Sequence, residues 1–297
     1  MKVTTLRLGT RGSALALWQS RWVASRLESS GDLRVDLVVI RTAGDKEQDA
    51  PLSSLGGKGL FTREIEIALL AGVVDFAVHS LKDLPTELPP GLTLSAFPRR
   101  EDPRDVLIAS VPLDALAPGA VVGTGSLRRQ CQLQAARPDL VFRDIRGNVT
   151  TRIEKWRSGE YDAVVLAMAG VRRLGPETTG LREEELHALE PELCAPAPCQ
   201  GILGLECRES DTATLGWLSR LSDPATEVEA RAERSFLKKL GGGCNLPAGA
   251  LARAGKLVEL RAVLRTSRGL ASVELRGGPE KAASLGRQAA AHLLSLG

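Results

Sequence analysis

The hydrophobic and polar positions in the first two-thirds of the chain follow two different periods. Apolar residues at alternate positions, or in short unbroken runs, predict strands, whereas apolar residues three and four positions apart predict helices. The predicted segments are 3–10 (strand), 13–29 (helix, with Ser13 as N-cap), 33–42 (strand), 56–74 (glycine loop opening a helix), 74–81 (buried strand), 120–138 (strand, tight loop, helix) and 140–170 (strand, loop, helix, strand). This alternation predicts an α/β fold around largely parallel sheets.

The last part of the chain has a different pattern. Residues 226–240 predict a helix that starts with a capping box, Thr226 and Glu229, and stops at Gly241. Residues 256–278 predict antiparallel strands with a turn near Arg268–Gly269, and 279–297 predict a closing helix. The expected module is α+β and about 75 residues long, which is within the usual size range of a domain.

Composition fits an ordinary globular protein. The chain has 297 residues, 43% hydrophobic and 25% charged, which allows a sizeable core and, at roughly 100–200 residues per domain, two or three domains. Two proline-containing stretches, residues 96–105 and 191–201, are candidate linkers. The net charge of +3 is too small to indicate nucleic-acid binding by itself.

The expected compartment is the cytosol. No apolar run reaches the length of about eighteen residues that a membrane helix needs, and the N-terminal residues lack the apolar core and cleavage site of a signal peptide. The odd number of cysteines, in a compartment expected to be reducing, argues against a disulfide framework. With three histidines and no C-x-x-C pair, a structural zinc site is not expected.

One cysteine lies in unusual surroundings. Cys244 follows three glycines, Gly241–Gly243, and Pro247 follows it shortly afterwards. A cysteine kept for packing is normally placed inside a strand or helix, whereas this loop leaves the sulfur reachable. The other cysteines are Cys131, Cys194, Cys199 and Cys207.

Several loops at predicted strand ends contain cationic side chains. Residues 9–13 and 123–129 each end a strand and open a helix, and each combines backbone N–H groups, a hydroxyl group and arginine. Such helix N-termini favour a bound anion, and ligands of open α/β sheets bind beyond the carboxyl ends of the strands. Further cations in segments of this kind are Arg146, Arg152, Arg172, Arg173 and Lys58. The expected ligand therefore carries several anionic groups.

Each of these features also has a simpler interpretation. A single loop arginine is most often a solvated surface charge, and the glycines around Lys58 lack the full spacing of a P-loop. Nucleotides remain an alternative class of anionic ligand, although the chain has no glycine-rich dinucleotide fingerprint. Four arginine-containing loops at predicted strand ends, residues 9–13, 123–129, 146–152 and 170–175, are nevertheless difficult to attribute to solubility alone.

A carboxylate follows the buried strand at 74–81. Ser80, Lys82 and Asp83 come directly after it, and the segment ends at Pro85. The simpler interpretation is an exposed ion pair at a strand end. The functional interpretation is a carboxylate at the mouth of a site, which stays ionised near many cations and either stabilises a developing positive charge or moves a proton.

Taken together, these segments resemble the hydroxymethylbilane synthase family, also called porphobilinogen deaminases. The matching stretches run in order from residue 10 to residue 244: TRGSALALWQS, GGKGLFTREIE, AVHSLKDLPT, REDPRD, GTGSLRRQCQL, RGNVTTR, YDAVVLAMAGVRRLG, GLECR and GGC. Small residues are usual in the family where this chain has Pro198 and Cys199.

The resemblance implies a transferase. The family joins four porphobilinogen molecules head to tail, releases ammonia at each condensation and hydrolyses the product from the enzyme. A dipyrromethane cofactor, one per chain, serves as primer and is held by a cysteine thioether, which this resemblance assigns to Cys244. Asp83 is implied as the catalytic carboxylate. The implied cofactor-binding residues are Lys82, Asp83, Thr124, Ser126, Arg128, Arg129, Arg146 and Arg152. The implied substrate-binding residues are Arg11, Ser13, Lys58, Ser80, Arg173 and Gln200.

The resemblance also implies a fold with three domains. Two α/β domains, residues 1–98 with 199–217 and residues 99–198, are expected to resemble periplasmic binding proteins, and residues 218–297 form the α+β domain with the cysteine. A monomer in the cytoplasm, without nucleic-acid or membrane partners, is expected. The competing class is a non-catalytic anion-binding protein on the same kind of fold. Asp83 and Cys244 favour the enzyme, and the absence of a signal peptide weighs against a secreted binder.

Overall fold

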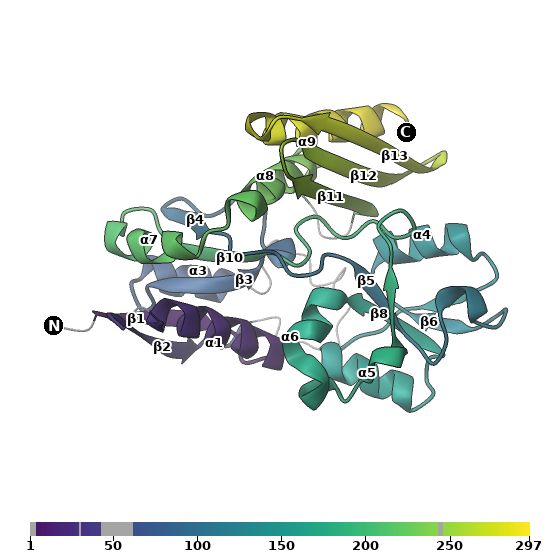
Figure 1. The fold of residues 1–297 in the computed structure, drawn as a ribbon, viewed down its shortest axis with the longest axis horizontal. Helices are drawn as coiled ribbons and strands as arrows, with labels where there is room; N and C mark the ends of the chain where they lie inside the picture. The colour runs from purple at the N-terminus through teal and green to yellow at the C-terminus, as the bar shows by residue number, and fades with distance from the viewer. Residues whose placement is uncertain (1–3, 30, 43–61, 243–245) are drawn as a thin grey trace. The chain divides into compact units, whose positions relative to one another are not determined.

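The computed structural model describes residues 4–29, 31–42, 62–242 and 246–297. The chain forms two compact units, residues 1–100 with 202–227 and residues 101–201 with 228–297 (Figure 1). The chain passes between the units at 100–101, inside the first proline-containing stretch, and at 201–202, at the end of the second. The third passage, at 227–228, lies inside helix α8 (Pro224–Lys239). The three-domain division stays a prediction.

The first unit is built on a five-stranded sheet with the order β2-β1-β3-β10-β4. Its strands are β1 (Thr4–Thr10), β2 (Leu33–Val39), β3 (Phe76–Ser80), β4 (Leu92–Ala96) and β10 (Leu203–Arg208). Strand β1 is parallel to β2 and β3, whereas β10 is antiparallel to β3 and β4. The three parallel strands therefore point their carboxyl ends at one edge of the sheet.

Helices cover both faces of this sheet, because successive residues of a strand face opposite sides and pack into two different cores. Phe76 and Val78 pack with residues of α1 (Ala14–Glu28) and α7 (Thr212–Leu218), whereas Ala77 packs with residues of α3 (Arg63–Leu70). A strand buried on both faces is expected to be continuously apolar, as β3 is at Phe76–Val78.

The second unit contains a sheet of the same design, with the order β7-β6-β8-β5-β9. Its strands are β5 (Asp105–Ile108), β6 (Val121–Gly123), β7 (Val141–Arg143), β8 (Ala163–Ala167) and β9 (Leu186–Leu189). Strand β6 is parallel to β7 and β8, and β5 is antiparallel to β8 and β9. The helices that follow the parallel strands are α4 (Leu127–Ala136), α5 (Val149–Arg157) and α6 (Met168–Thr179).

The rest of the second unit is the predicted α+β module. Its antiparallel sheet consists of β11 (Ala248–Ala254), β12 (Val258–Thr266) and β13 (Gly269–Gly277), and its core includes residues of α8 and α9 (Ala282–Ser295). Strand β11 contacts the segment after β9, where Ala250 N donates to Pro196 O. Gly249 makes this approach possible, because a Cβ atom there would lie 2.7 Å from Ala195 O.

The predicted α/β fold with an α+β module is confirmed, and one helix start was wrong. Helix α8 begins at Pro224, so Thr226 lies inside it. Its first turn is capped by Asp223, whose Oδ1 accepts the backbone N–H of Thr226 at 2.8 Å. Proline is favoured at the first helical position, because the N–H group of that residue has no acceptor within the helix. The helix therefore starts at the Asp223–Pro224 pair and not at the capping-box pattern. None of the helices in the described ranges combines the length and apolar character needed to span a membrane.

Candidate active site

The first unit gathers predicted site residues at the carboxyl edge of its sheet. Arg11 and Ser13 follow β1, and Lys82 and Asp83 follow β3, which is parallel to β1. Gln19 of α1 links the two segments, because its Nε2 donates to Ser80 Oγ at 3.0 Å. The edge where parallel strands end is where ligands of such sheets bind.

Ser13 has a structural role in this arrangement. Its Oγ accepts the backbone N–H of Ala16 at 3.3 Å, which confirms the prediction that it caps α1. The cap fixes the turn between β1 and α1, and Arg11 lies in this turn.

Asp83 presents an exposed carboxylate on a fixed backbone. It ends the 3-10 helix η1 (Leu81–Asp83) and is exposed, and no hydrogen bond or ion pair joins its carboxylate to another residue in the described ranges. Its neighbours Leu81 and Leu84 are buried, and Leu81 N donates to Ile202 O at 3.0 Å. A general base or a stabiliser of positive charge needs this combination of a fixed position and a free carboxylate.

A buried polar cluster with no counterpart among the predicted site residues lies next to this segment. His79 Nε2 is 3.0 Å from Glu206 Oε2, and both side chains are almost fully buried. Burial, with a smaller contribution from the charge of Glu206, raises the pKa of Glu66 on α3. The pair connects β3 to β10 immediately before Ser80. The sequence indicates this pair through Glu206, a glutamate inside the otherwise apolar strand β10, because a buried carboxylate requires a partner.

The second unit also gathers site residues at the carboxyl ends of its parallel strands. Thr124, Ser126, Arg128 and Arg129 follow β6, and Arg146 and Arg152 follow β7. Arg172 and Arg173 follow β8 but lie inside α6 instead of in a loop. Asp105 reaches the same edge from an antiparallel strand, since its register partner is Ala167 at the end of β8.

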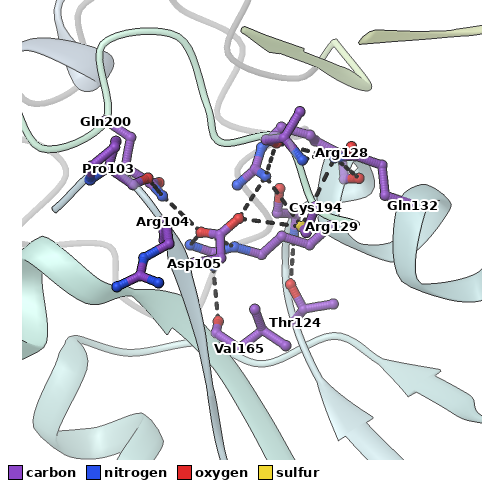
Figure 2. Close-up of polar contacts among 12 residues, drawn as sticks. Pro103, Arg104, Asp105, Thr124, Arg128, Arg129, Gln132, Val165, Cys194 and Gln200 are labelled. Atoms are coloured by element: carbon purple, nitrogen blue, oxygen red, sulfur yellow. Dashed lines mark hydrogen bonds and ion pairs between the residues drawn. The ribbon is translucent and has the colours of Figure 1, made fainter. Parts of the chain in front are cut away.

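Asp105 is the centre of a buried network (Figure 2). Its Oδ2 accepts from Arg128 Nη1 at 2.6 Å, and its Oδ1 accepts from Arg129 Nε and Nη2 at 3.0 and 2.7 Å. Gln200 Nε2 also donates to Oδ1, at 2.8 Å. Burial alone would raise the pKa of Asp105, but the charges and hydrogen bonds of the two arginines hold it well below its usual range. The aspartate is therefore ionised.

Cys194 completes the network as a donor. Its Sγ lies 3.4 Å from Asp105 Oδ2, and burial together with the charge of Asp105 raises the pKa of the Cys194 thiol to about 12. A thiol that stays protonated is not a nucleophile. Burial also raises the pKa of Cys207.

The other predicted residues of this edge have local partners. Arg146 Nε donates to Asp144 Oδ2 at 3.0 Å, and Arg152 Nε donates to Gly147 O at 2.8 Å. Thr124 Oγ1 accepts the backbone N–H of Ser126 at 3.3 Å. Lys58 and Cys244 lie outside the described residues.

Arg173 is a buried cation that lacks a hydrogen-bonded carboxylate among the described residues. It is 8% exposed, and its Nη2 donates to the backbone oxygen of Gly201 at 2.6 Å. Burial lowers the pKa of Arg173 to about 10, although the charge of Glu101 acts in the opposite direction. The guanidinium is still charged at neutral pH, so its desolvation is compensated only in part. An anion bound at this side chain would complete the compensation.

Comparison with known proteins gives one consistent family. The family model "Porphobilinogen deaminase, dipyromethane cofactor binding domain" matches residues 6–216, and "Porphobilinogen deaminase, C-terminal domain" matches residues 228–295. The curated porphobilinogen deaminase of Syntrophus aciditrophicus (strain SB) is 47% identical over 298 residues, covering 98% of this chain and 96% of the relative.

Solved structures with low sequence identity are also similar. The methionine-binding protein MetQ has a TM-score of 0.46 at 12% identity, covering 77% of this chain and 94% of that chain. The ytmK protein of Bacillus subtilis has a TM-score of 0.44 at 9% identity, covering 80% of this chain and 97% of that chain.

Proposed function

Because the chain belongs to the porphobilinogen deaminase family, we propose that Asp83 is its catalytic carboxylate and that Cys244 holds its cofactor. The activity is that of a hydroxymethylbilane synthase, a transferase that joins four porphobilinogen molecules into a linear tetrapyrrole and releases ammonia at each condensation. The cofactor is dipyrromethane, which supplies the primer for the first condensation.

The observation that carries the assignment of Asp83 is its exposed carboxylate at the carboxyl edge of the first sheet, which has no hydrogen-bond or ion-pair partner among the described residues. Each condensation breaks the C–N bond of an aminomethyl group and forms a C–C bond between pyrrole rings. A proton must reach the leaving nitrogen, and another must leave the attacked ring carbon. An ionised carboxylate stabilises the positive charge that develops on the pyrrole and accepts or returns a proton at Oδ1 or Oδ2.

The cationic residues fit the chemistry of both ligands. Each pyrrole of the cofactor and substrate carries an acetate and a propionate, and arginine binds carboxylates through two parallel hydrogen bonds. The buried, only partly compensated Arg173 supports this fit. For the cofactor we assign Lys82, Asp83, Thr124, Ser126, Arg128, Arg129, Arg146 and Arg152. For the substrate we assign Arg11, Ser13, Lys58, Ser80, Arg173 and Gln200.

Replacing Arg173 with methionine is expected to stabilise the unliganded protein and to weaken substrate binding. Removing a poorly compensated buried charge raises the free energy of unfolding by about 1 kcal/mol. The KM for porphobilinogen rises about tenfold or more, because a charged hydrogen bond contributes about 1.5–3 kcal/mol. Urea unfolding and steady-state kinetics measure the two effects.

The neighbouring Arg172 provides the control for this variant. It is exposed and lies 3.3 Å from Asp102 in an ion pair, so Arg172→Met is expected to give little change in either measurement. An Arg173→Met protein that loses stability and keeps the wild-type KM would show that Arg173 has only a structural role.

The function is tested by incubating the purified chain with porphobilinogen. We expect release of ammonia together with a linear tetrapyrrole product. The competing class, a non-catalytic anion-binding protein, predicts binding of porphobilinogen without release of ammonia. That result, obtained with folded protein, would refute the assignment of enzymatic activity.

We also propose that the protein acts as a cytoplasmic monomer without nucleic-acid or membrane partners, and that it has the three domains predicted from the sequence. Among the described residues, the free cysteines Cys131, Cys194 and Cys207 support a reducing compartment. Size-exclusion chromatography with light scattering tests the monomer, for which a mass near 31.6 kDa is expected.

A further inference from the structure

The Asp105 network contains an aspartate to which the proposed function gives no role. We propose that Asp105 is a positioning residue, which fixes the guanidinium groups of Arg128 and Arg129 and leaves the pair with a net positive charge for a ligand carboxylate. This inference rests on the proposed function, in which these two arginines bind carboxylates of the dipyrromethane. It adds a residue that acts through them without contacting the ligand.

The geometry restricts both arginines. Arg129 is held through three nitrogens, because Nε and Nη2 donate to Asp105 and Nη1 donates to Val165 O at 2.9 Å. Arg128 Nη1 is shared between Asp105 and Ala195 O, at 2.6 and 2.7 Å. Figure 2 shows the two side chains converging on the aspartate from the first turn of α4. Two long, flexible side chains are therefore ordered before any ligand binds, which reduces the entropy that binding must overcome.

The aspartate is itself held by neutral groups. Gln200 donates to Oδ1 and Cys194 to Oδ2, so each oxygen has a donor besides the arginines. Gln132 Nε2 donates to Ala195 O at 3.1 Å, and Gln132 Oε1 accepts the backbone N–H of Ala195 at 2.9 Å. These two bonds fix the backbone that Arg128 contacts. These contacts come from several separate parts of the second unit, so the position of Asp105 is determined by the fold of that unit.

The charges of the network do not cancel. Two guanidinium groups face one carboxylate, while Cys194 is held protonated and Gln132 and Gln200 are neutral. Neither arginine forms an ion pair with any other carboxylate in the part of the chain that the structure describes. An excess positive charge on side chains that are 5% and 6% exposed is costly, and a bound carboxylate would neutralise it.

Hydrogen-bond donors are also left for that carboxylate. Arg128 uses only Nη1 within the described ranges, so its Nε and Nη2 donate to no described residue. A guanidinium has five N–H donors in a rigid, planar arrangement. The edge formed by Nε and Nη2 can donate two parallel hydrogen bonds to one carboxylate. Asp105 thus orients the guanidinium by occupying Nη1 and leaves the Nε–Nη2 edge available.

The test is the rate at which the full-length chain acquires its cofactor. The chain is purified from cells that make no porphobilinogen and is then incubated with porphobilinogen, and intact mass is followed over time. Asp105→Asn is expected to load about a hundredfold more slowly than wild type, the size of effect that misplaced groups produce. Asp105→Glu keeps the charge but shifts the arginines, so its rate should be intermediate.

Asp75→Asn is the matched control. Asp75 also accepts from two arginines, Arg7 Nη2 at 2.7 Å and Arg208 Nη2 at 3.4 Å, but it lies in the first unit and outside the proposed site. Its loss is expected to lower the thermal stability without changing the loading rate. A purely structural role for Asp105 predicts the same behaviour from Asp105→Asn.

The outcomes distinguish the role of Asp105 from the assignment of the cofactor. Folded Asp105→Asn that loads at the wild-type rate would overturn the role of Asp105. If Asp105→Asn does not fold, Asp105→Glu decides: slower loading by folded protein supports the inference, and wild-type loading overturns it. A wild-type chain that never gains mass would instead contradict the cofactor assignment, on which this inference depends.

Discussion

Replacing Cys244 with alanine is expected to give a folded chain that carries no dipyrromethane and has no measurable turnover. A thioether requires a nucleophilic sulfur, and the buried cysteines of the described ranges are poor substitutes. Cys194 has a pKa of about 12, and Cys199 and Cys207 are 2% and 0% exposed. The variant should therefore keep the mass of its sequence after incubation with porphobilinogen.

Cys131→Ala is the control for this variant. Cys131 is partly exposed, and its replacement should leave both cofactor loading and turnover unchanged. Cofactor attached to Cys199, Cys207 or any other side chain in the Cys244→Ala protein would refute the assignment of Cys244.

Replacing Asp83 with alanine is expected to lower turnover by about a hundredfold to ten-thousandfold, the usual contribution of a general acid or base. The fold should be unaffected, because the side chain is exposed and has no hydrogen bond or ion pair within the described ranges. Steady-state turnover and thermal unfolding measure the two effects. Asp83→Glu should recover part of the turnover, because it keeps the carboxylate.

Asp114→Ala is a matched control for the loss of Asp83. Asp114 is another exposed aspartate in a short 3-10 helix, η2 (Leu113–Ala115), but it belongs to the second unit and to no proposed site. Its loss should change neither turnover nor stability. Wild-type turnover in Asp83→Ala would remove Asp83 from the mechanism.

Local patterns predicted many of the strands and helices, but not β4, β5, β9, β10, β11, α6 or α7. The turn after β1, with Ser13 as a cap, and the loop before α4 each depend on a few neighbouring residues. Their position at carboxyl strand ends then follows from the parallel pairing of β1 with β3 and of β6 with β7 and β8. The likeness of the two sheets to each other arises from the same strand order in both units.

Side-chain partners that come from distant segments were not predictable in this way. Asp105 is 23 residues from Arg128 and 95 from Gln200 in sequence, and its own segment was interpreted as a linker. The available signal was a carboxylate opening an apolar run, Val106–Ala109, because a charge at the head of a buried strand needs partners. His79 and Glu206 are a second pair of this kind.

Burial of an arginine is likewise a property of the folded chain. Arg173 was grouped with loop cations, but α6 directs it into the second unit while the adjacent Arg172 stays exposed. The backbone conformation of Cys199 was likewise not predictable from local sequence, since its φ of 65° lies in a region that favours glycine. Neither feature follows from local sequence, because each depends on the packing of segments that are far apart along the chain.

The intact mass of the full-length protein, purified in active form, tests the central claim most directly. An enzyme with a covalently bound primer must be heavier than its 31.6 kDa sequence by one dipyrromethane, and the added mass must lie on the peptide that contains Cys244. Protein that converts porphobilinogen while keeping the unmodified mass of its sequence would contradict the account.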